Sequence, residues 1–312
     1  MKVLVVSPNY FPEDILSEFD GVADVVCRDM SREELLNEIG NYDAVLTRVD
    51  TTFDKHVLEK ATRLKVIGTS TTGLDHIDVE DAIARGIKIF NLSGTHTVPA
   101  AELTFSLILS LVRKIPGAHS SLSSGKWNRH EFVGTELEGK TLGIIGFGRI
   151  GSRIGEYAKV FGMKIIAYDP YVDKSIVEKI GVKMVTLDDL FHNSDVITLH
   201  SFLSPETRDM INSSSISKMK KNAFLVNVSR GELVNDDDLL DALNEGKIAG
   251  AALDVFTEEP LPSNSKLTEY ARTHDNLILT PHIGASTKEA VIKSAKEIVH
   301  NVKEFLVNKR SD

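Results

Sequence analysis

The 312-residue sequence predicts an α/β protein with two doubly wound parallel-sheet domains, one inserted into the other. Short apolar runs alternate with amphipathic stretches along the chain, a pattern typical of parallel strands covered by helices. A glycine-rich turn, Gly146–Gly151, lies in the middle of the chain, so another α/β domain of about 100 residues is expected before it. The sequence ends in a helical pattern with no strand after it, and such a helix could return to pack on the first domain.

The expected strands form two series, separated by one long apolar helix. The first series is Val3–Val6, Ala44–Leu46, Lys65–Ile67 and Ile87–Phe90. The second is Leu142–Ile145, Lys164–Tyr168, Val196–Leu199, Phe224–Val228, Ala249–Leu253 and Leu277–Leu279. The helix between them begins near Pro99 and runs to about Arg113, and it carries the chain into the second domain. Apolar residues at helical spacing predict the final helix between Thr287 and Val307.

Composition excludes several classes of protein. The formal net charge of −9 argues against a general nucleic-acid binder. The single cysteine, Cys27, cannot form an internal disulfide, and its apolar neighbours suggest a buried structural thiol in a reducing compartment. The apolar runs Met1–Val6 and Leu103–Val112 are too short for a signal sequence and a membrane span. We therefore expect a cytoplasmic protein with no nucleic-acid or membrane partner, and no Cys/His spacing predicts a metal.

The glycine turn carries the pattern Gly-x-Gly-x-x-Gly directly after an apolar strand. Gly146 permits the tight turn, Gly148 lets a pyrophosphate approach the backbone, and Gly151 lets the helix lie close to the strand. The helix N-terminus offers N–H groups to the phosphates. Asp169 ends the next strand at about the 20-residue distance of the dinucleotide fingerprint, where it can bind the ribose 2′-OH of NAD and repel a 2′-phosphate. Alternatively, Asp169 only caps the turn that follows its strand.

Three side chains that follow strands of the second series could reduce a 2-keto acid. That reaction needs a cation for the carboxylate, an acid for the carbonyl oxygen and a hydride donor. Arg230 can grip the carboxylate with two N–H groups, His282 can deliver the proton, and Glu259 can hold the imidazole and favour its protonated form. Each has a plainer interpretation, as a surface cation, a hydrogen-bonded loop histidine and a solvated loop acid. Their joint occurrence at strand ends favours a catalytic site.

Together these segments resemble the D-isomer-specific 2-hydroxyacid dehydrogenase family over nearly the whole chain. Gly146–Gly151 with Asp169 looks like its NAD turn, and Asn227–Gly231, Asp254–Pro260 and Pro281–Thr287 look like its Arg, Glu and His motifs. The resemblance implies that Arg230, Glu259 and His282 are catalytic. The candidate NAD contacts in addition to the glycines and Asp169 are Arg149, Ile150, Val228, Asp254 and Ala285, with His200 at a strand end and Thr207 completing the set.

The resemblance also implies a fold and an assembly. Residues 1–97 with 284–312 would form a flavodoxin-like substrate domain, and residues 98–283 a Rossmann-type NAD-binding domain. A homodimer built on the long helix after Val98 is expected. In the first-domain loop Gly68–Asp78, backbone N–H groups near Thr72 and Gly73 would hold the substrate carboxylate.

Within the family, the segments Gly125–Leu137 and Gly250–Pro260 look most like members that act on 3-phosphoglycerate. Arg48 and Arg129 match phosphate-binding arginines of those members, the second contributed across the dimer. Alternatively, Arg129 only pairs with an acid across the dimer. Thr69 stands where those members often carry a further arginine, which keeps open hydroxypyruvate, glyoxylate or another unphosphorylated D-2-hydroxyacid.

A function of a different class is a non-catalytic NAD-sensing protein, because the family's transcriptional corepressors keep the same three residues. The lack of long disordered extensions disfavours it. A formate dehydrogenase is also disfavoured, because its histidine is partnered by Gln where this chain has Glu259. The chain ends after its final helix, so no regulatory extension is expected. The expected function is an NAD-dependent D-2-hydroxyacid dehydrogenase, with 3-phosphoglycerate of serine biosynthesis as the first candidate substrate.

Overall fold

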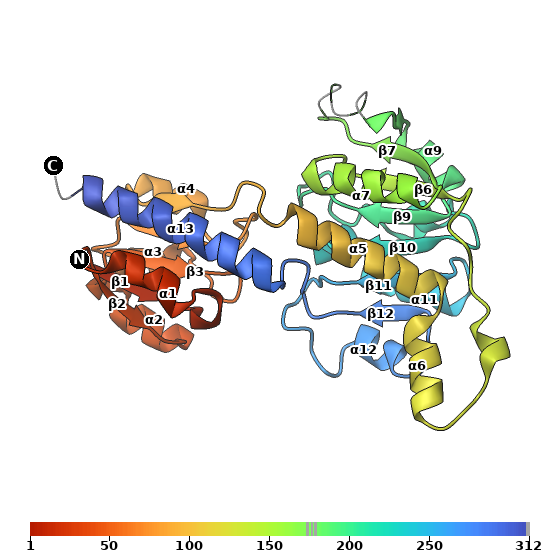
Figure 1. Cartoon of the computed structure of the whole chain (residues 1–312), viewed down its shortest axis with the longest axis horizontal. Coiled ribbons are helices and arrows are strands. Elements are labelled where there is room, and N and C mark those ends of the chain that lie inside the picture. The colour runs from red at the N-terminus through yellow and green to blue at the C-terminus, as the bar shows by residue number, and fades with distance from the viewer. Residues whose placement is uncertain (173–174, 176, 178–179, 310–312) are drawn as a thin grey trace. The chain divides into compact units, whose positions relative to one another are not determined.

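The computed structural model describes residues 1–172, 175, 177 and 180–309. The chain divides into two compact units, which we call unit 1 (Met1–His96 with Ala285–Asp312) and unit 2 (Thr97–Gly284) (Figure 1). Unit 2 is therefore inserted into unit 1, and it is longer by one residue at each end than the expected 98–283. Residues 310–312, at the end of the expected first domain, lie outside the described residues.

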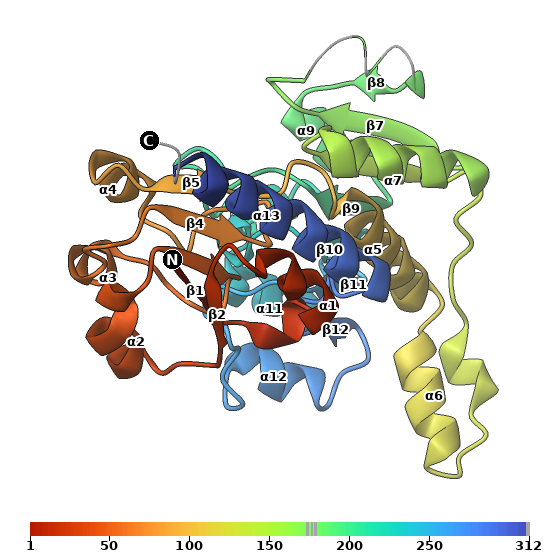
Figure 2. The same cartoon turned by 60° about the vertical axis from the view of Figure 1, so that its left-hand side comes forward.

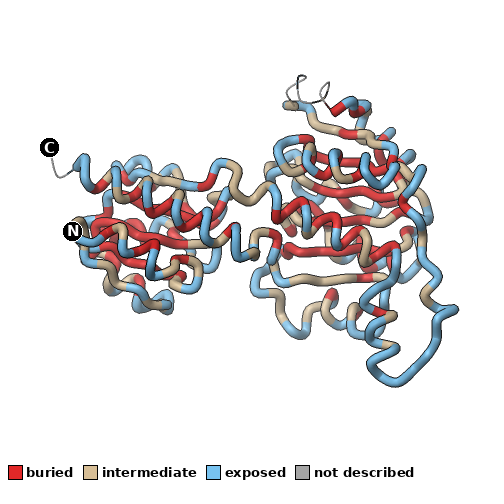
Figure 3. The backbone as a smooth tube through the Cα atoms, in the orientation of Figure 1, coloured by how far each residue is buried: buried red, intermediate tan, exposed pale blue. Residues whose placement is uncertain are grey.

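Unit 1 contains a five-stranded parallel sheet in the order β2-β1-β3-β4-β5, which is the flavodoxin-like order. Its strands are β1 (Lys2–Val5), β2 (Asp24–Cys27), β3 (Ala44–Thr47), β4 (Val66–Thr69) and β5 (Lys88–Phe90). The central strands are buried except for Lys2 at the start of β1, and Figure 3 shows the buried sheet. Their continuous apolar runs are what a sheet with both faces covered requires.

The helices of unit 1 cover both faces of this sheet. They are α1 (Glu13–Leu16), α2 (Arg32–Glu38), α3 (Lys55–Lys60), α4 (Val79–Ala84) and α13 (Lys288–Asn308), with the short 3₁₀ turns η1 (Pro8–Tyr10), η2 (Ser17–Phe19) and η3 (Ile39–Asn41). The final helix, α13, does return to unit 1, where it lies along β4 (Figures 1 and 2). Gly68 of β4 makes room for it, because a Cβ there would stand 2.7 Å from both Ile298 and Val302.

Cys27 is exposed, so the expectation of a buried structural thiol was wrong. Its strand, β2, was not expected from the sequence, and it lies at one edge of the sheet. An edge strand has one neighbour and is only partly covered, so the four residues of β2 are intermediate or exposed and form no continuous buried run. Apolar neighbours in the sequence therefore did not imply burial here.

Unit 2 contains a seven-stranded parallel sheet in the order β12-β11-β10-β9-β6-β7-β8. Counted from β6, the first six strands follow the Rossmann order, and β12 extends the sheet beyond β11. The strands are β6 (Thr141–Ile145), β7 (Lys164–Tyr168), β8 (Lys183–Met184), β9 (Val196–Leu199), β10 (Phe224–Asn227), β11 (Gly250–Leu253) and β12 (Leu277–Leu279). The two-residue edge strand β8 was not expected from the sequence. The strand order reverses between β6 and β9, which is where such sheets bind ligands.

The described helices of unit 2 are α5 (Thr97–Val112), α6 (Ile115–Ser123), α7 (Arg149–Val160), α9 (Leu187–Asn193), α10 (Ser213–Ile216), α11 (Asp236–Asn244) and α12 (Lys266–Ala271), with η4 (Arg129–Phe132) and η5 (Gly231–Leu233). The predicted apolar helix is α5, which packs on α7 and on the strands β10 and β11. Within the described residues, no helix combines the length and the apolar character needed to cross a bilayer.

A segment that we call the arm, residues 113–137, projects from unit 2 around α6 and η4 (Figure 1). It exposes large apolar side chains, with Trp127 78% exposed, Val133 72% and Leu122 57%. Figure 3 shows this segment as mostly exposed, in contrast to the sheet. Exposed apolar groups gathered on one projecting segment are typical of a contact surface.

Candidate active site

The glycine turn after β6 has the geometry that a dinucleotide needs. Gly146 has a φ of +88°, and a Cβ there would lie 2.5 Å from the carbonyl carbon of His200. A Cβ on Gly151 would lie 2.2 Å from the carbonyl oxygen of Gly146, so the helix α7 could not approach the turn. A Cβ on Gly148 would meet nothing within 4 Å, which leaves space for a phosphate at the N-terminus of α7. The three glycines therefore fit NAD for three different reasons.

Asp169 follows β7 and reaches back to the glycine turn. Its Oδ2 accepts a hydrogen bond from the Phe147 N–H at 2.8 Å, and its Oδ1 accepts one from the Tyr171 N–H at 2.8 Å. The second contact is the turn-capping role that was the alternative interpretation. A carboxylate has about four lone-pair sites, so two backbone contacts leave capacity for a ribose hydroxyl. Asp169 thus joins the glycine turn to the position where the ribose is expected.

His282 and Glu259 form a direct pair, although they come from loops after different strands. The Nδ1 of His282 lies 2.6 Å from Oε2 of Glu259, and the other carboxylate oxygen accepts the Phe256 N–H at 3.0 Å. An ionised carboxylate only accepts, so the Nδ1–H of His282 donates and Nε2 is left to exchange a proton with a substrate. His282 has a φ of +50°, in the left-handed region that non-glycine residues adopt rarely and often at functional sites.

Glu259 is held in its ionised form. Burial by itself raises the pKa of this carboxyl, but the hydrogen bond and charge of His282, the Phe256 N–H and the charge of Arg230 bring the pKa below its usual value. The charge of Arg230 acts on Glu259 at this edge, and its Nη1 donates to the Ser229 carbonyl at 2.7 Å. The structure therefore brings Arg230, Glu259 and His282 to one edge of the sheet.

The close approach of two loops explains why a glycine follows Arg230. A Cβ on Gly231 would stand 2.0 Å from the carbonyl carbon of Phe256 and 2.3 Å from the Thr257 nitrogen. The loop that carries Arg230 can therefore lie against the loop that carries Glu259 only if residue 231 has no side chain. Asn227 further fixes this loop by donating from Nδ2 to the Arg230 carbonyl at 2.7 Å. Gly231 lies within the Arg motif expected from the sequence, but its packing role was not predicted.

Asp254, expected to touch NAD, is fully buried and holds the loop of His282. Oδ1 accepts from Thr280 Oγ1 at 2.6 Å and from the Ile283 N–H at 2.9 Å, while Oδ2 accepts from the Gly284 N–H at 2.8 Å. Burial raises the pKa of Asp254, and these hydrogen bonds and the charge of His282 offset the rise only in part. Thr280 was not singled out from the sequence, although a hydroxyl just before the Pro281-His282 pair was a usable signal.

The remaining cofactor candidates lie mostly on the carboxyl side of the same sheet. His200 follows β9, its Nε2 lies 2.7 Å from Thr198 Oγ1, and burial lowers its pKa to about 3, so its imidazole is neutral. Thr207 uses its hydroxyl to close its own loop, accepting from the Ser204 N–H and donating to the Phe202 carbonyl, both at 2.8 Å. The other candidates are placed as follows: Arg149 and Ile150 in the first turn of α7, Val228 after β10, and Ala285 at the start of the second segment of unit 1.

The candidates in unit 1 also follow strands. Arg48 comes directly after β3, and its guanidinium carbon lies 3.8 Å from the centre of the Tyr10 ring. Thr72 and Gly73 lie in the turn after β4, with Thr72 exposed. Thr69, where the resemblance raised the possibility of an arginine, is fully buried and offers no group to a ligand at the surface.

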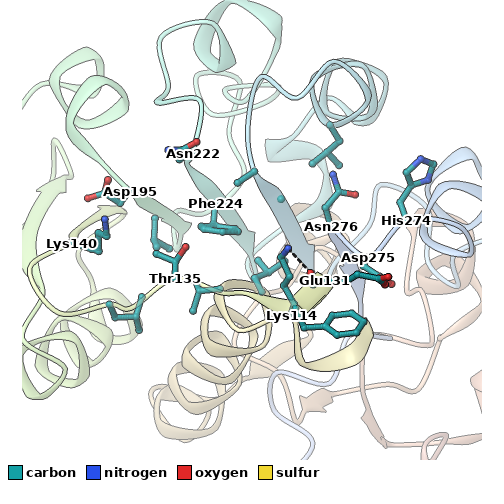
Figure 4. Close-up of a pocket in the computed structure, with 18 of the residues that line it drawn as sticks. Lys114, Glu131, Thr135, Lys140, Asp195, Asn222, Phe224, His274, Asp275 and Asn276 are labelled. Carbon is teal, nitrogen blue, oxygen red and sulfur yellow. Dashed lines mark hydrogen bonds between the residues drawn. The ribbon is translucent and has the colours of Figure 1, made fainter. Parts of the chain in front are cut away.

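Arg129 does not lie at the edge of the sheet that holds His282 and Glu259. It begins η4 in the arm, and the last two residues of that turn, Glu131 and Phe132, line a cavity of about 710 Å³ (Figure 4). The cavity is bordered by the first residues of three strands, Val196, Phe224 and Gly250. It therefore lies at the amino end of the parallel sheet, whereas the pair His282–Glu259 follows the carboxyl ends. An Arg129 that binds substrate would have to act on another copy of the chain.

The chain is similar to known proteins over most of its length. The sequence model described as "D-isomer specific 2-hydroxyacid dehydrogenase, NAD binding domain" matches residues 105–284. The D-3-phosphoglycerate dehydrogenase of Methanocaldococcus jannaschii is 44% identical over 308 residues, which are 98% of this chain and 57% of that protein. The enzyme of the same name from Bacillus subtilis is 42% identical over 269 residues, 86% of this chain and 50% of that protein. The chain thus spans about half the length of the curated relatives it matches.

Solved structures resemble the chain over almost their whole length. A protein of Thermus thermophilus superposes with a TM-score of 0.88 at 32% identity, covering 96% of this chain and 95% of that one. The D-lactate dehydrogenase of Aquifex aeolicus, solved with NAD and lactic acid, gives a TM-score of 0.87 at 29% identity and covers 100% of this chain and 97% of that one.

Proposed function

Because the chain belongs to the D-isomer specific 2-hydroxyacid dehydrogenase family, we propose that it transfers a hydride between NAD(H) and a D-2-hydroxyacid/2-keto acid pair. The observation that carries this proposal is the 2.6 Å contact between His282 and Glu259 at the edge that also holds Arg230. A histidine whose Nδ1–H donates to an ionised carboxylate can act as a general acid through Nε2. A guanidinium beside it suits a substrate carboxylate.

In this proposal each residue has one task in keto acid reduction. Arg230 binds and orients the substrate carboxylate through its planar fork of N–H groups. His282 gives the proton on Nε2 to the carbonyl oxygen, while Glu259 stabilises the imidazolium before that transfer. The Gly146–Gly151 turn and Asp169 would hold NADH, which would supply the hydride. In the direction of hydroxyacid oxidation, His282 takes the proton back.

We further propose 3-phosphoglycerate/3-phosphohydroxypyruvate as the substrate pair, which would place the protein in serine biosynthesis. Two relatives that share more than 40% identity with this chain carry the name D-3-phosphoglycerate dehydrogenase, which supports the proposal. In it, unit 1 is the substrate domain, with Arg48 and the Thr72–Gly73 turn as anion-binding groups. The nearest alternative is an unphosphorylated acid such as hydroxypyruvate or glyoxylate, which the buried Thr69 keeps open.

A homodimer completes the proposal. The exposed apolar side chains of the arm, with Trp127 78% exposed, suit a contact between two copies of the chain. Arg129 in the same arm would then serve the partner's site. Light scattering combined with size exclusion tests the assembly, since a mass of twice 34.4 kDa is expected. We also propose a cytoplasmic location, because a chain with a single cysteine fits a reducing compartment, and cell fractionation tests this.

The test of the proposed activity is NADH oxidation with a panel of 2-keto acids, with and without a phosphate on carbon 3. The proposal expects turnover with at least one member and loss of turnover in His282→Ala. No turnover with any member, in a protein that binds NADH, would overturn the dehydrogenase and favour an NAD-sensing protein. Turnover with unphosphorylated acids alone would overturn the 3-phosphoglycerate assignment and leave the general one.

A further inference from the structure

In the turn after β4, three successive backbone carbonyl oxygens each accept a hydrogen bond. The Leu92 N–H donates to the Thr71 carbonyl at 2.8 Å, and Asn91 Nδ2 donates to the Thr72 carbonyl at 2.9 Å. The third carbonyl, that of Gly73, accepts from Thr71 Oγ1 at 2.7 Å. Across the described residues, the backbone N–H groups of Thr72 and Gly73 meet no acceptor. Successive N–H groups presented by a turn whose carbonyls point elsewhere form an anion-binding concavity.

The hydroxyl that holds Gly73 is the end of a chain of hydrogen bonds. Thr71 Oγ1 lies 2.9 Å from Thr69 Oγ1, which lies 3.0 Å from Nε2 of His76. The Gly73 carbonyl can only accept, so the Thr71 hydroxyl donates to it and accepts from the Thr69 hydroxyl. The Thr69 hydroxyl must then accept from His76, which therefore carries a proton on Nε2. All donors in the chain point toward the turn.

Burial of the three side chains favours a single arrangement of these hydrogen bonds. Thr69 is 0% exposed, Thr71 5% and His76 7%. A buried hydroxyl that loses its partner keeps its full desolvation penalty, so the three groups favour the arrangement in which every bond is made. The sequence alone gave no sign of this network, because Thr69 was noted only for the arginine it replaces.

We propose that Thr69, Thr71 and His76 are positioning residues, whose buried hydrogen-bond chain shapes the Thr72–Gly73 turn to hold the carboxylate of the 2-keto acid. The hydroxyl of Thr69 serves the turn and does not contact the substrate itself. The identity of the anion rests on the proposed function, whereas the network rests on geometry within unit 1. Disturbing it should weaken substrate binding more than the chemistry that follows.

Thr71→Val tests the proposal, with Thr71→Ser as the matched control. Valine has nearly the shape of threonine but lacks the hydroxyl, while serine keeps the hydroxyl and loses a methyl group. Loss of one buried hydrogen bond predicts a rise of about tenfold in KM for the 2-keto acid in Thr71→Val, with kcat and the KM for NADH within about twofold of wild type. Thr71→Ser should stay within about threefold of wild type. Thr69→Val, one step farther from the turn, should raise the same KM by a smaller factor.

Two results would overturn the proposal in an active enzyme. One is an unchanged KM in Thr71→Val. The other is an equal loss of kcat and thermal stability in both Thr71 variants, which would mark a purely structural role. If the wild-type protein reduces no 2-keto acid, the proposed function fails. Hydrogen exchange at the Leu92 amide then tests the hydrogen-bond network without any need for enzyme activity. Faster exchange in Thr71→Val than in Thr71→Ser supports the proposal, and equal rates overturn it.

Discussion

Replacing the buried carboxylate of Asp254 should displace the loop of His282, the proposed general acid, while leaving the His282 side chain itself unchanged. In Asp254→Asn, the side-chain oxygen can still accept from Thr280 and the Ile283 N–H, now at 2.6 and 2.9 Å from Oδ1. The new amide NH₂ then faces the Gly284 N–H, which donates to Oδ2 at 2.8 Å in the native protein. Two donors would oppose each other at a fully buried position.

The size of the effect follows from the bond that is lost. A hydrogen bond to a charged group is worth about 1.5–3 kcal/mol, and an unsatisfied buried N–H costs a similar amount. If the loop shifts to relieve the conflict, His282 moves with it, and kcat/KM should fall roughly 10- to 150-fold. Thr280→Val is the matched control, because it removes one donor but leaves both backbone contacts of the carboxylate. It should lower kcat/KM by less than Asp254→Asn does, because no buried N–H is left without an acceptor.

Steady-state NADH oxidation measures this effect, using the 2-keto acid that the wild-type protein turns over fastest. NADH affinity is measured separately by fluorescence titration. Wild-type kcat/KM in Asp254→Asn would refute the role of Asp254 in holding the loop. A loss confined to NADH affinity, with kcat unchanged, would instead make Asp254 a cofactor contact, as the sequence first suggested.

Four further predictions concern the cofactor, the acid pair and the phosphate. Asp169 should give NADH a preference over NADPH of more than tenfold in kcat/KM, about 1.4 kcal/mol, and parity would remove this role. His282→Ala should lose on the order of 10²–10⁴ in kcat while NADH still binds; near-normal kcat would mean that the proton comes from elsewhere. Glu259 keeps a pKa below its usual value and is ionised at neutral pH, so Glu259→Gln removes a negative charge that favours imidazolium. The pH at which reduction declines should therefore move downward, and an unmoved pH profile would count against the pair. Arg129→Ala should raise KM for 3-phosphohydroxypyruvate about tenfold and leave KM for an unphosphorylated acid nearly unchanged, because a charged hydrogen bond to phosphate is lost. An equal effect on both substrates would indicate a role in the dimer alone.

Much of the fold could be predicted because its signals are local. Buried parallel strands need continuous apolar runs, and helices at the surface need apolar residues at a 3.6-residue period, so the central strands, α5 and α13 were all expected. Strands that follow this rule poorly were missed. β2 and β8 are edge strands with partly exposed residues, and their sequences carry no continuous run.

The side chains proposed as catalytic could be identified because each lies in a loop that follows a strand, and parallel strands share a carboxyl edge. The pairing of Glu259 with His282 was expected from the chemistry of the two side chains, and they lie 2.6 Å apart. The contact of His282 with Glu259 joins residues 23 positions apart on the loops after β12 and β11. The close packing of the Arg230 loop on the Glu259 loop depends in turn on Gly231. The inward turn of Asp254 toward Thr280, Ile283 and Gly284 likewise depends on the neighbouring loop after β12.

The sequence by itself therefore determined the two doubly wound sheets, the glycine turn and the set of strand ends that carry polar groups, because these follow from periodicity and from the backbone freedom of glycine. Only the tertiary structure decided which polar groups are buried and which partner each one has. Cys27 is exposed because its strand lies at a sheet edge, and Thr69, Thr71 and His76 are joined because the turn after β4 folds back on itself. Burial and pairing are properties of neighbours in space, and a chain brings those neighbours together only when it folds.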